Sequence, residues 1–372
     1  MDIVLLIGSL AIILVAAELF TNGIEWVGHK LNLAEGAVGS VLAAVATAMP
    51  ETLIPVIAIL GPVILGGTAS EASHAVGVGA ILGAPFMLST LAMFVTGIAI
   101  VYYARRGRRG TDMRVNTGVL GRDIVFFIVG YAVAIGTAFL PPEIDWLKWV
   151  AAGFLFILYG VYVKLHFSDE AEESDAGDLA KLHLTRVPGM EGPRTLEIDV
   201  LPGAHSITGG EPRLWVVITQ VAIALALIIV GAQVFVGAVE HLSTVIGLDP
   251  TILALIIAPI ATELPEKFNS VLWVRNGKDT LAMGNITGAM VFQSCLPTVV
   301  GLLFTTWAFT PDTLIYFASA GVAFVATILI FGGMMLRGRL SAWALLIGGP
   351  LYLFYIYLAL FTDLGAVAPA VH

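Results

Sequence analysis

Runs of about 20 predominantly apolar residues recur along this chain, and no other feature restricts its possible folds so strongly. Each run is long enough for a helix to cross the roughly 30 Å hydrocarbon core of a membrane. The composition agrees, because 58% of the 372 residues are hydrophobic and only 12% are charged, whereas soluble domains contain about 25% charged residues. A soluble fold would have to bury all of these runs at once. The sequence therefore predicts an all-α polytopic membrane protein.

We predict ten membrane-spanning helices, five on each side of one long polar stretch. Their expected ranges are Ile3–Val27, Gly36–Ile64, His74–Tyr103, Asp123–Leu140, Trp146–Lys164, Leu214–Ile246, Thr251–Trp273, Leu281–Trp307, Leu314–Leu336 and Trp343–Leu360. The stretch between the two sets is acidic at its start and interrupted by Gly and Pro, so it has too little apolar surface to pack a core. The chain is expected to divide into a first five-helix repeat (1–165), an acidic linker loop (166–213) and a second five-helix repeat (214–372).

The positions of Lys and Arg predict the orientation of the spans. Six arginines lie between the third and fourth spans, and further basic residues lie in the linker loop and in the connections that would share its side. The opposite side has only Lys148. Because basic loops stay on the cytoplasmic side, we expect a cytoplasmic linker loop, both termini outside, and a location in the plasma (inner) membrane.

Charge and cysteine content exclude some classes of partner and site. The formal net charge of −9 argues against a nucleic-acid partner. The single cysteine, Cys295, excludes an intramolecular disulfide framework and a thiolate metal cluster. From composition, the expected partner is therefore membrane lipid and not nucleic acid.

The two halves share a motif in their second spans. Residues 46–51 read A-T-A-M-P-E, and residues 261–266 read A-T-E-L-P-E. Because five spans per half is an odd number, this similarity implies that the halves are inserted with opposite orientations. We therefore expect ten transmembrane helices in two inverted five-helix repeats.

The shared motif would bring negative charge and oxygen atoms to the middle of the membrane. A bare charge on Glu51 or Glu266 would cost at least about 2.5 kcal/mol there, so a cation or proton is expected to compensate it. Proline has no N–H, so the carbonyl four residues before it loses its helical partner. Carboxylate, hydroxyl and carbonyl oxygens are hard ligands that suit Na⁺, Ca²⁺ or Mg²⁺. The alternative is that proline only kinks each helix and the glutamate pairs with a neighbouring donor.

At these residues the sequence resembles the calcium/cation antiporter superfamily, and the sodium/calcium exchanger type in particular. That family carries two repeats, each with a G-T-S-x-P-E-like motif on one helix and a G-N-x-x-G-S-N-like motif on the next. Here the second motifs read G-A-I-L-G-A-P at residues 79–85 and G-N-I-T-G-A-M at residues 284–290. The resemblance covers residues 10–90 and 225–300 in detail, and the ten-span plan throughout.

The resemblance implies a group of cation sites midway through the membrane, reached alternately from each side. Carried over by position, Glu51 and Glu266 would be the principal carboxylate ligands. Thr47 and Thr262 would supply hydroxyl or carbonyl oxygens, and Asn285 a side-chain oxygen. The transported ions would be Ca²⁺, Na⁺ or H⁺, with no further cofactor.

The second repeat departs from the family pattern by gaining charged residues. Glu263 stands where the family has Ser, and Glu263, Glu266 and Lys267 are spaced so that they can share one side of a helix. With Glu51, the three acids and one Lys leave a formal charge of about minus two, which one divalent cation, two Na⁺ ions or two protons would neutralise. We hypothesise that Lys267 stands in for a coupling ion. The alternatives are that it extends toward solvent or only pairs with Glu263.

One further acid lies within a predicted span. Glu18 in the first span is a candidate for a proton-coupled or gating role. The alternative is a carboxyl group that is kept neutral by burial or hydrogen-bonded inside the bundle.

Three function classes remain open. The first is a secondary cation antiporter that exchanges Ca²⁺, or another cation, for Na⁺ or H⁺. The second is a non-transporting membrane sensor with degenerate ion sites, which the loss of polar residues at Ala80 and Ala84 favours. The third is an intramembrane hydrolase that uses carboxylates, but no H-E-x-x-H or G-x-S-x-G motif is present in the sequence. We therefore expect a transporter that is not an enzyme.

Overall fold

The computed structural model is almost entirely helical. It describes residues 2–30, 41, 44–64, 67, 70–168, 182–186, 212–246, 263–275 and 277–361. The longer helices before residue 169 are α1 (Asp2–Lys30), α4 (Met49–Ile64), α5 (Glu71–Met87), α6 (Met93–Arg105), α7 (Thr117–Gly136) and α8 (Leu147–Ser168). Those after residue 212 are α9 (Leu214–Ile246), α11 (Leu264–Arg275), α12 (Asp279–Phe304), α13 (Leu314–Arg337) and α15 (Gly348–Phe361).

The remaining elements are short. They are α3 (Ala44–Thr47), the π-helical turn η2 (Leu88–Ala92), the 3-10 turns η3 (Thr137–Phe139), η4 (Pro142–Ile144), η6 (His183–Arg186) and η7 (Pro311–Thr313), the helix α14 (Ala342–Leu345), and the strands β1 (Asp112–Met113) and β2 (Leu340–Ser341). The turn η2 joins α5 to α6 without a break, so the two form one long rod. Gly348 fits against the backbone of Thr90 in this turn, where a Cβ atom would clash.

Eight segments of the described chain are long and apolar enough to cross a membrane. They correspond to eight of the ten predicted spans. The other two predictions, Gly36–Ile64 and Thr251–Trp273, are the segments that contain the shared motif. Of these, the structure describes helices α3 and α4 in the first half and residues 263–275 in the second.

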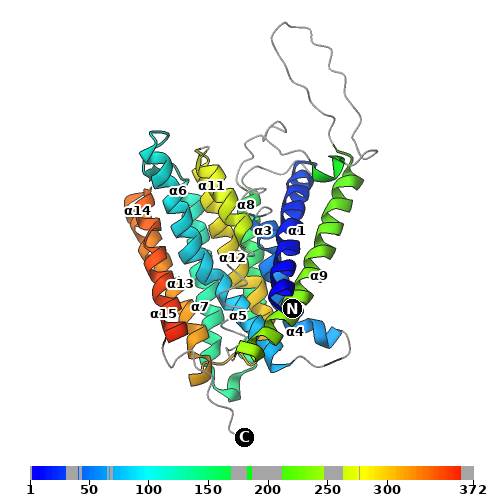
Figure 1. The fold of residues 1–372 in the computed structure, drawn as a ribbon. Helices are drawn as coiled ribbons and strands as arrows, with labels where there is room; N and C mark the ends of the chain where they lie inside the picture. The colour runs from blue at the N-terminus through cyan, green and yellow to red at the C-terminus, as the bar shows by residue number, and fades with distance from the viewer. Residues whose placement is uncertain are drawn as a thin grey trace.

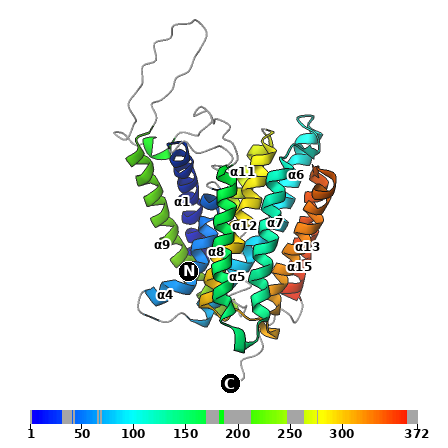
Figure 2. The same ribbon diagram turned by 180° about the vertical axis from the view of Figure 1, so that it is seen from behind.

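The helices run roughly parallel to one another and form a bundle with α12 inside it (Figure 1). Helices α1 and α9 lie side by side at one edge, and α13, α14 and α15 lie at the opposite edge (Figures 1 and 2). Nearly every residue of α12 from Ala282 to Leu302 is buried. Polar side chains on α12 therefore face protein on all sides.

The bundle contains two differently packed parts. One large apolar core joins α5 to α8 with α12 to α15, and we call these helices the body. Helices α1 and α9, the α1/α9 pair, contribute instead to three smaller clusters. Two glycines bring the pair close together, because Gly23 packs against Val221 and Gly231 against Ile13.

Three loops of the body are joined at one end by contacts that we call the loop clasp. The guanidinium of Arg109, in the loop after α6, donates to both carboxylate oxygens of Asp279 at 2.7 and 2.6 Å and to the Val274 carbonyl. In the same loop, β1 pairs antiparallel with β2, which follows α13. Connections from both halves of the chain are thus fixed to one another.

Most of the predicted linker loop lies outside the described residues, as does the expected end of the second repeat. Residues 182–186 are described and contact the α1/α9 pair. Leu182 is buried with Trp26 and Val217, and the Leu184 N–H donates to the side chain of Gln220 on α9. This part of the polar stretch therefore does contribute to packing.

Candidate cation-binding site

The first copy of the shared motif lies at a break between two helices. Helix α3 ends at Thr47, Ala48 forms a turn, and α4 begins at Met49. Pro50 is the second residue of α4, where a missing N–H costs no helical hydrogen bond. Glu51 follows in the first turn and is buried, with 4% of its surface exposed. The partial positive charge of a helix N-terminus favours the negative charge of such a carboxylate.

The second copy has the same relation to its helix. Helix α11 begins Leu264-Pro265-Glu266, as α4 begins Met49-Pro50-Glu51. The prolines thus lie at the starts of helices, so the alternative that each proline only kinks a helix does not describe them. The position of the Glu266 side chain lies outside what the structure describes, as does that of Thr47, and Thr262 belongs wholly to the undescribed residues 247–262.

Helix α12 carries polar side chains past the break in the first half. Asn285 is fully buried. Gln293 is 1% exposed, and its Nε2 donates to the carbonyl of Ala48 at 3.2 Å. Among the described residues, no hydrogen-bond partner is found for the other amide atom of Gln293, the oxygen Oε1. This oxygen is therefore a hard ligand atom held beside the turn from which Glu51 projects.

Glu263 and Lys267 form a buried ion pair at the start of α11. The Lys267 Nζ donates to Glu263 Oε2 at 2.9 Å, and the two side chains are 7% and 1% exposed. Lys267 does not extend toward solvent, which was one of the alternatives. The second carboxylate oxygen of Glu263, Oε1, is buried without a hydrogen-bond partner among the described residues.

Glu18 lies apart from these groups. Its side chain is 72% exposed, and its Oε1 is 3.6 Å from Nε2 of His183 in η6. The carboxyl group is therefore not buried inside the bundle. The structure places this sequence candidate on the outside of α1.

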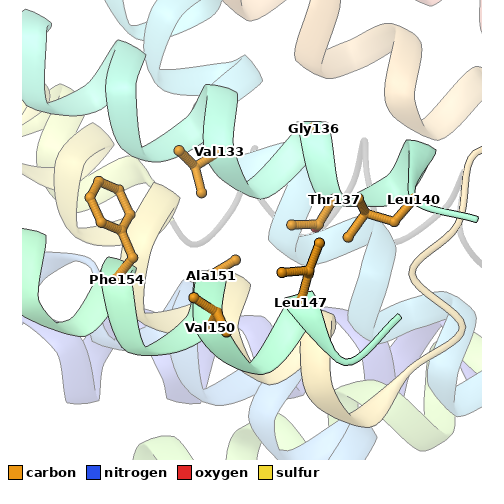
Figure 3. A pocket seen from close by; sticks show the side chains of 8 residues that line it. All are labelled: Val133, Gly136, Thr137, Leu140, Leu147, Val150, Ala151 and Phe154. Atoms are coloured by element: carbon orange, nitrogen blue, oxygen red, sulfur yellow. The ribbon is translucent and has the colours of Figure 1, made fainter. Parts of the chain in front are cut away.

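No cluster of three or more His, Cys, Asp and Glu side chains that could hold a metal occurs among the residues described. The expected acid set of Glu51, Glu263 and Glu266 depends on a side chain outside that description. A pocket between α7 and α8 is lined by apolar residues and Thr137, as Figure 3 shows. Its lining offers no charged group, so it is unsuited to a cation.

Asp123 and His166 are polar residues that the sequence analysis did not single out. Both are buried in the body, where His166 Nε2 lies 3.2 Å from Asp123 Oδ1. The signal for them was available, because an ionisable side chain inside an apolar span is uncommon. In the sequence analysis, Asp123 is only the first residue of the predicted span Asp123–Leu140.

The chain resembles known exchangers in sequence and in fold. A family model described as sodium/calcium exchanger protein matches residues 1–167 and 216–361. A putative antiporter, CaxA, from Alkalimonas amylolytica is 30% identical over 79 residues, which are 21% of this chain and 25% of that protein. The chain thus matches about a quarter of the length of this curated relative.

Two solved structures share the fold over almost the whole chain. The H⁺/Ca²⁺ exchanger CAX superposes with a TM-score of 0.71 at 15% identity, covering 97% of this chain and 82% of that one. The sodium-calcium exchanger NCX_Mj superposes with a TM-score of 0.59 at 15% identity, covering 97% and 99%. With the apolar helices, these similarities identify an integral membrane protein with the fold of the exchangers.

Proposed function

Because the chain belongs to the sodium/calcium exchanger protein family, we propose that it is a secondary antiporter that exchanges Ca²⁺, or another cation, for Na⁺ or H⁺. The observation that carries this proposal is Glu51, a carboxylate buried in the first turn of α4 where two helices meet. A buried carboxylate supplies the hard oxygen ligands that bind a transported cation.

The proposed binding site combines groups from both halves of the chain. Glu51 and Glu266 are the main carboxylate ligands, with oxygens from Thr47, Thr262 and Asn285. Gln293 Oε1 joins them, because it is buried beside Ala48 without another partner among the described residues. These are hard oxygen ligands of the kind that bind Ca²⁺ and Na⁺.

We assign Lys267 the role of a fixed cation in this site. Its ammonium group neutralises one oxygen of Glu263 and leaves the other buried. An ammonium group in this position reduces the number of mobile cations that the site needs. The proposal therefore favours proton coupling, or fewer ions per cycle, and replacing Lys267 by Met should change the coupling stoichiometry.

The proposed architecture has ten spans in two inverted repeats. Its support is that α4 and α11 begin with the same Pro-Glu arrangement. The distribution of Lys and Arg supports a cytoplasmic linker loop with both termini outside, and we propose the plasma (inner) membrane as the location. In the proposed alternating-access cycle, the α1/α9 pair moves over the body and exposes the site to each side in turn.

Counterflow in proteoliposomes tests this function. Purified protein is reconstituted, and uptake of Ca²⁺, Mg²⁺ and Mn²⁺ is measured against Na⁺ and H⁺ gradients in turn. Glu51→Gln keeps the shape of the side chain but removes its charge, so we expect transport to fall by at least about tenfold, the effect of 1.4 kcal/mol. The control is Glu143→Gln in η4, an exposed residue away from the site.

Two outcomes would reject the proposal. If the wild-type protein moves none of these ions under any gradient, the non-transporting sensor becomes the better description. If Glu51→Gln transports every ion as well as the wild type does, the assignment of the site is wrong.

A further inference from the structure

A second buried polar cluster lies where α7, α8 and α12 meet. Asp123 on α7 accepts hydrogen bonds from the Tyr162 hydroxyl at 3.1 Å and approaches Thr287 Oγ1 at 2.6 Å. The imidazole of His166 on α8 lies 3.2 Å from the Asp123 carboxyl group through Nε2, and its Nδ1 is 3.1 Å from the Tyr162 carbonyl. All four side chains are at most 4% exposed.

The two ring nitrogens of His166 both face oxygen atoms, which fixes the number of protons in the cluster. The Tyr162 carbonyl can only accept, so Nδ1 carries the hydrogen of that bond. A neutral imidazole has no second N–H, and its Nε2 would then present a lone pair to an ionised carboxylate 3.2 Å away. The Nε2–Oδ1 contact is too poorly aligned for a hydrogen bond, so it is an ion pair or a contact with a protonated acid.

The hydroxyl of Thr287 contacts the other carboxylate oxygen of Asp123 and is compatible with either placement of this proton. This hydroxyl has one hydrogen but lies near two oxygens, Asp123 Oδ2 at 2.6 Å and the Met283 carbonyl at 3.0 Å. Either it donates to an ionised Asp123 that is paired with a charged His166, or a protonated Asp123 donates to it and it donates to Met283. In both assignments, Asp123 and His166 together carry one proton more than an ionised Asp123 beside a neutral His166 would carry.

Other charged groups lie on the helices around the cluster, and Arg122 is close enough to Tyr162 to interact with it electrostatically. The titratable and charged side chains on the described elements that pack against Asp123 and His166 are Arg122 and Tyr131 of α7, Lys148, Tyr159, Tyr162 and Lys164 of α8, Asp279 and Cys295 of α12, and Tyr316 and Arg337 of α13. Arg122 donates to the Leu165 carbonyl, and Asp279 is bound by Arg109. A proton is therefore the cation that best balances this pair.

We propose that Asp123 and His166 form a proton-binding site that is separate from the candidate cation site and holds α12 against α7 and α8. Helix α12 links the proton-binding site to the candidate cation site, because Thr287, which contacts Asp123, lies two residues after Asn285 on this helix. Successive residues are about 100° apart around a helix, so the two side chains point in nearly opposite directions. When the proton is released to solvent, the Nε2 lone pair of His166 faces the ionised carboxylate of Asp123. The resulting repulsion weakens the contact of α12 with α7 and α8.

Spectroscopy tests proton binding without depending on transport. The full-length protein in lipid nanodiscs is labelled at its histidine imidazoles, and the His166 signal among the seven histidines is identified by its loss in His166→Gln. At neutral pH we expect either a doubly protonated imidazole or, by infrared spectroscopy, a protonated carboxylic acid that disappears in Asp123→Asn. A singly protonated imidazole together with an ionised Asp123 would overturn the proposal.

The consequence for transport rests on the proposed function and is tested separately. In proteoliposomes, cation exchange by the wild type should fall on the alkaline side by about tenfold per pH unit, as expected for loss of one proton. His166→Gln keeps a fixed N–H donor and should abolish this fall. His241→Gln, an exposed residue on α9, should keep it.

A milder variant covers the case in which His166→Gln does not fold. Tyr162→Phe removes the hydrogen bond that the hydroxyl donates to Asp123, so the pH dependence of exchange should differ from that of the wild type. If exchange occurs and its pH profile is identical in the wild type, His166→Gln and Tyr162→Phe, the link to transport is wrong. If no variant exchanges ions, the proposed function fails, while the spectra still decide whether the proton is bound.

Discussion

The α1/α9 pair is held by three separate apolar clusters, whereas the body shares one core that reaches from α5 to α15. The loop clasp further fixes the body through a partly buried bidentate ion pair between Arg109 and Asp279. The pair is attached to α5 by polar contacts, because Glu240 accepts hydrogen bonds from Ser70 and Ser73. Small clusters and a few polar bonds separate more easily than a continuous core, so in the proposed cycle we expect the α1/α9 pair to be the part that moves.

Linking the two parts should have the largest effect on transport. Ser73→Cys combined with Glu240→Cys, joined by a reducible bifunctional thiol reagent, ties α5 to α9. We expect exchange to be lost almost completely and to return when the link is reduced. The native Cys295 is buried and should not react.

A matched link inside the body serves as the control. Arg114→Cys and Thr280→Cys join two segments that are already in contact, so exchange should continue. If the link between Ser73→Cys and Glu240→Cys forms fully and exchange is unchanged, the pair does not move relative to α5. The difference in packing between the pair and the body would then not be related to transport.

Breaking the loop clasp should have the largest effect on stability. Arg109→Met leaves Asp279 with its charge buried at 2% exposure, and such a loss costs about 3–5 kcal/mol. Thermal unfolding in detergent measures the change. Lys148→Met is the control, because its partner Asp145 is 54% exposed and an exposed pair contributes at most about 1 kcal/mol. Equal effects of the two variants would show that the clasp does not stabilise the body.

Disturbing the contact within the pair should have a smaller effect on stability. A Cβ atom on Gly231 would lie 2.7 Å from Ile13 Cγ1, whereas one on Gly237 would meet nothing within 4 Å. We expect Gly231→Leu to lower the free energy of unfolding by about 1–3 kcal/mol. We also expect it to slow exchange, because the larger side chain forces α1 away from α9. Gly237→Leu should change neither unfolding nor exchange rate. A similar loss in both variants would mean that close packing of the pair is unimportant.

Much of the helical plan could be predicted from apolar runs alone. The predicted span Leu214–Ile246 has the bounds of α9, and Leu314–Leu336 differs from α13 by one residue at its end. The π-helical turn η2 was not predicted, because it lies inside a continuous apolar run and interrupts no pattern. The pairing of β1 with β2 was not predicted either, since two-residue strands in distant loops have no periodicity.

The candidate site was predictable only in part, and for a different reason. The Pro-Glu motif identified Glu51 because a charge inside an apolar run is a local signal. The contact of Gln293 with the Ala48 carbonyl and that of Thr287 with Asp123 join residues far apart in the chain. Which sides of three helices meet depends on packing, and a single sequence does not encode it locally.

The loop clasp also has a consequence for biosynthesis. Arg109 and β1 leave the ribosome early, but their partners are Asp279 and β2, in the last third of the chain. Until those residues have been synthesised, the Arg-rich loop after α6 is without them. The contacts of this loop therefore form only after most of the chain has been synthesised. Premature termination before residue 341 leaves β1 without a complete partner strand.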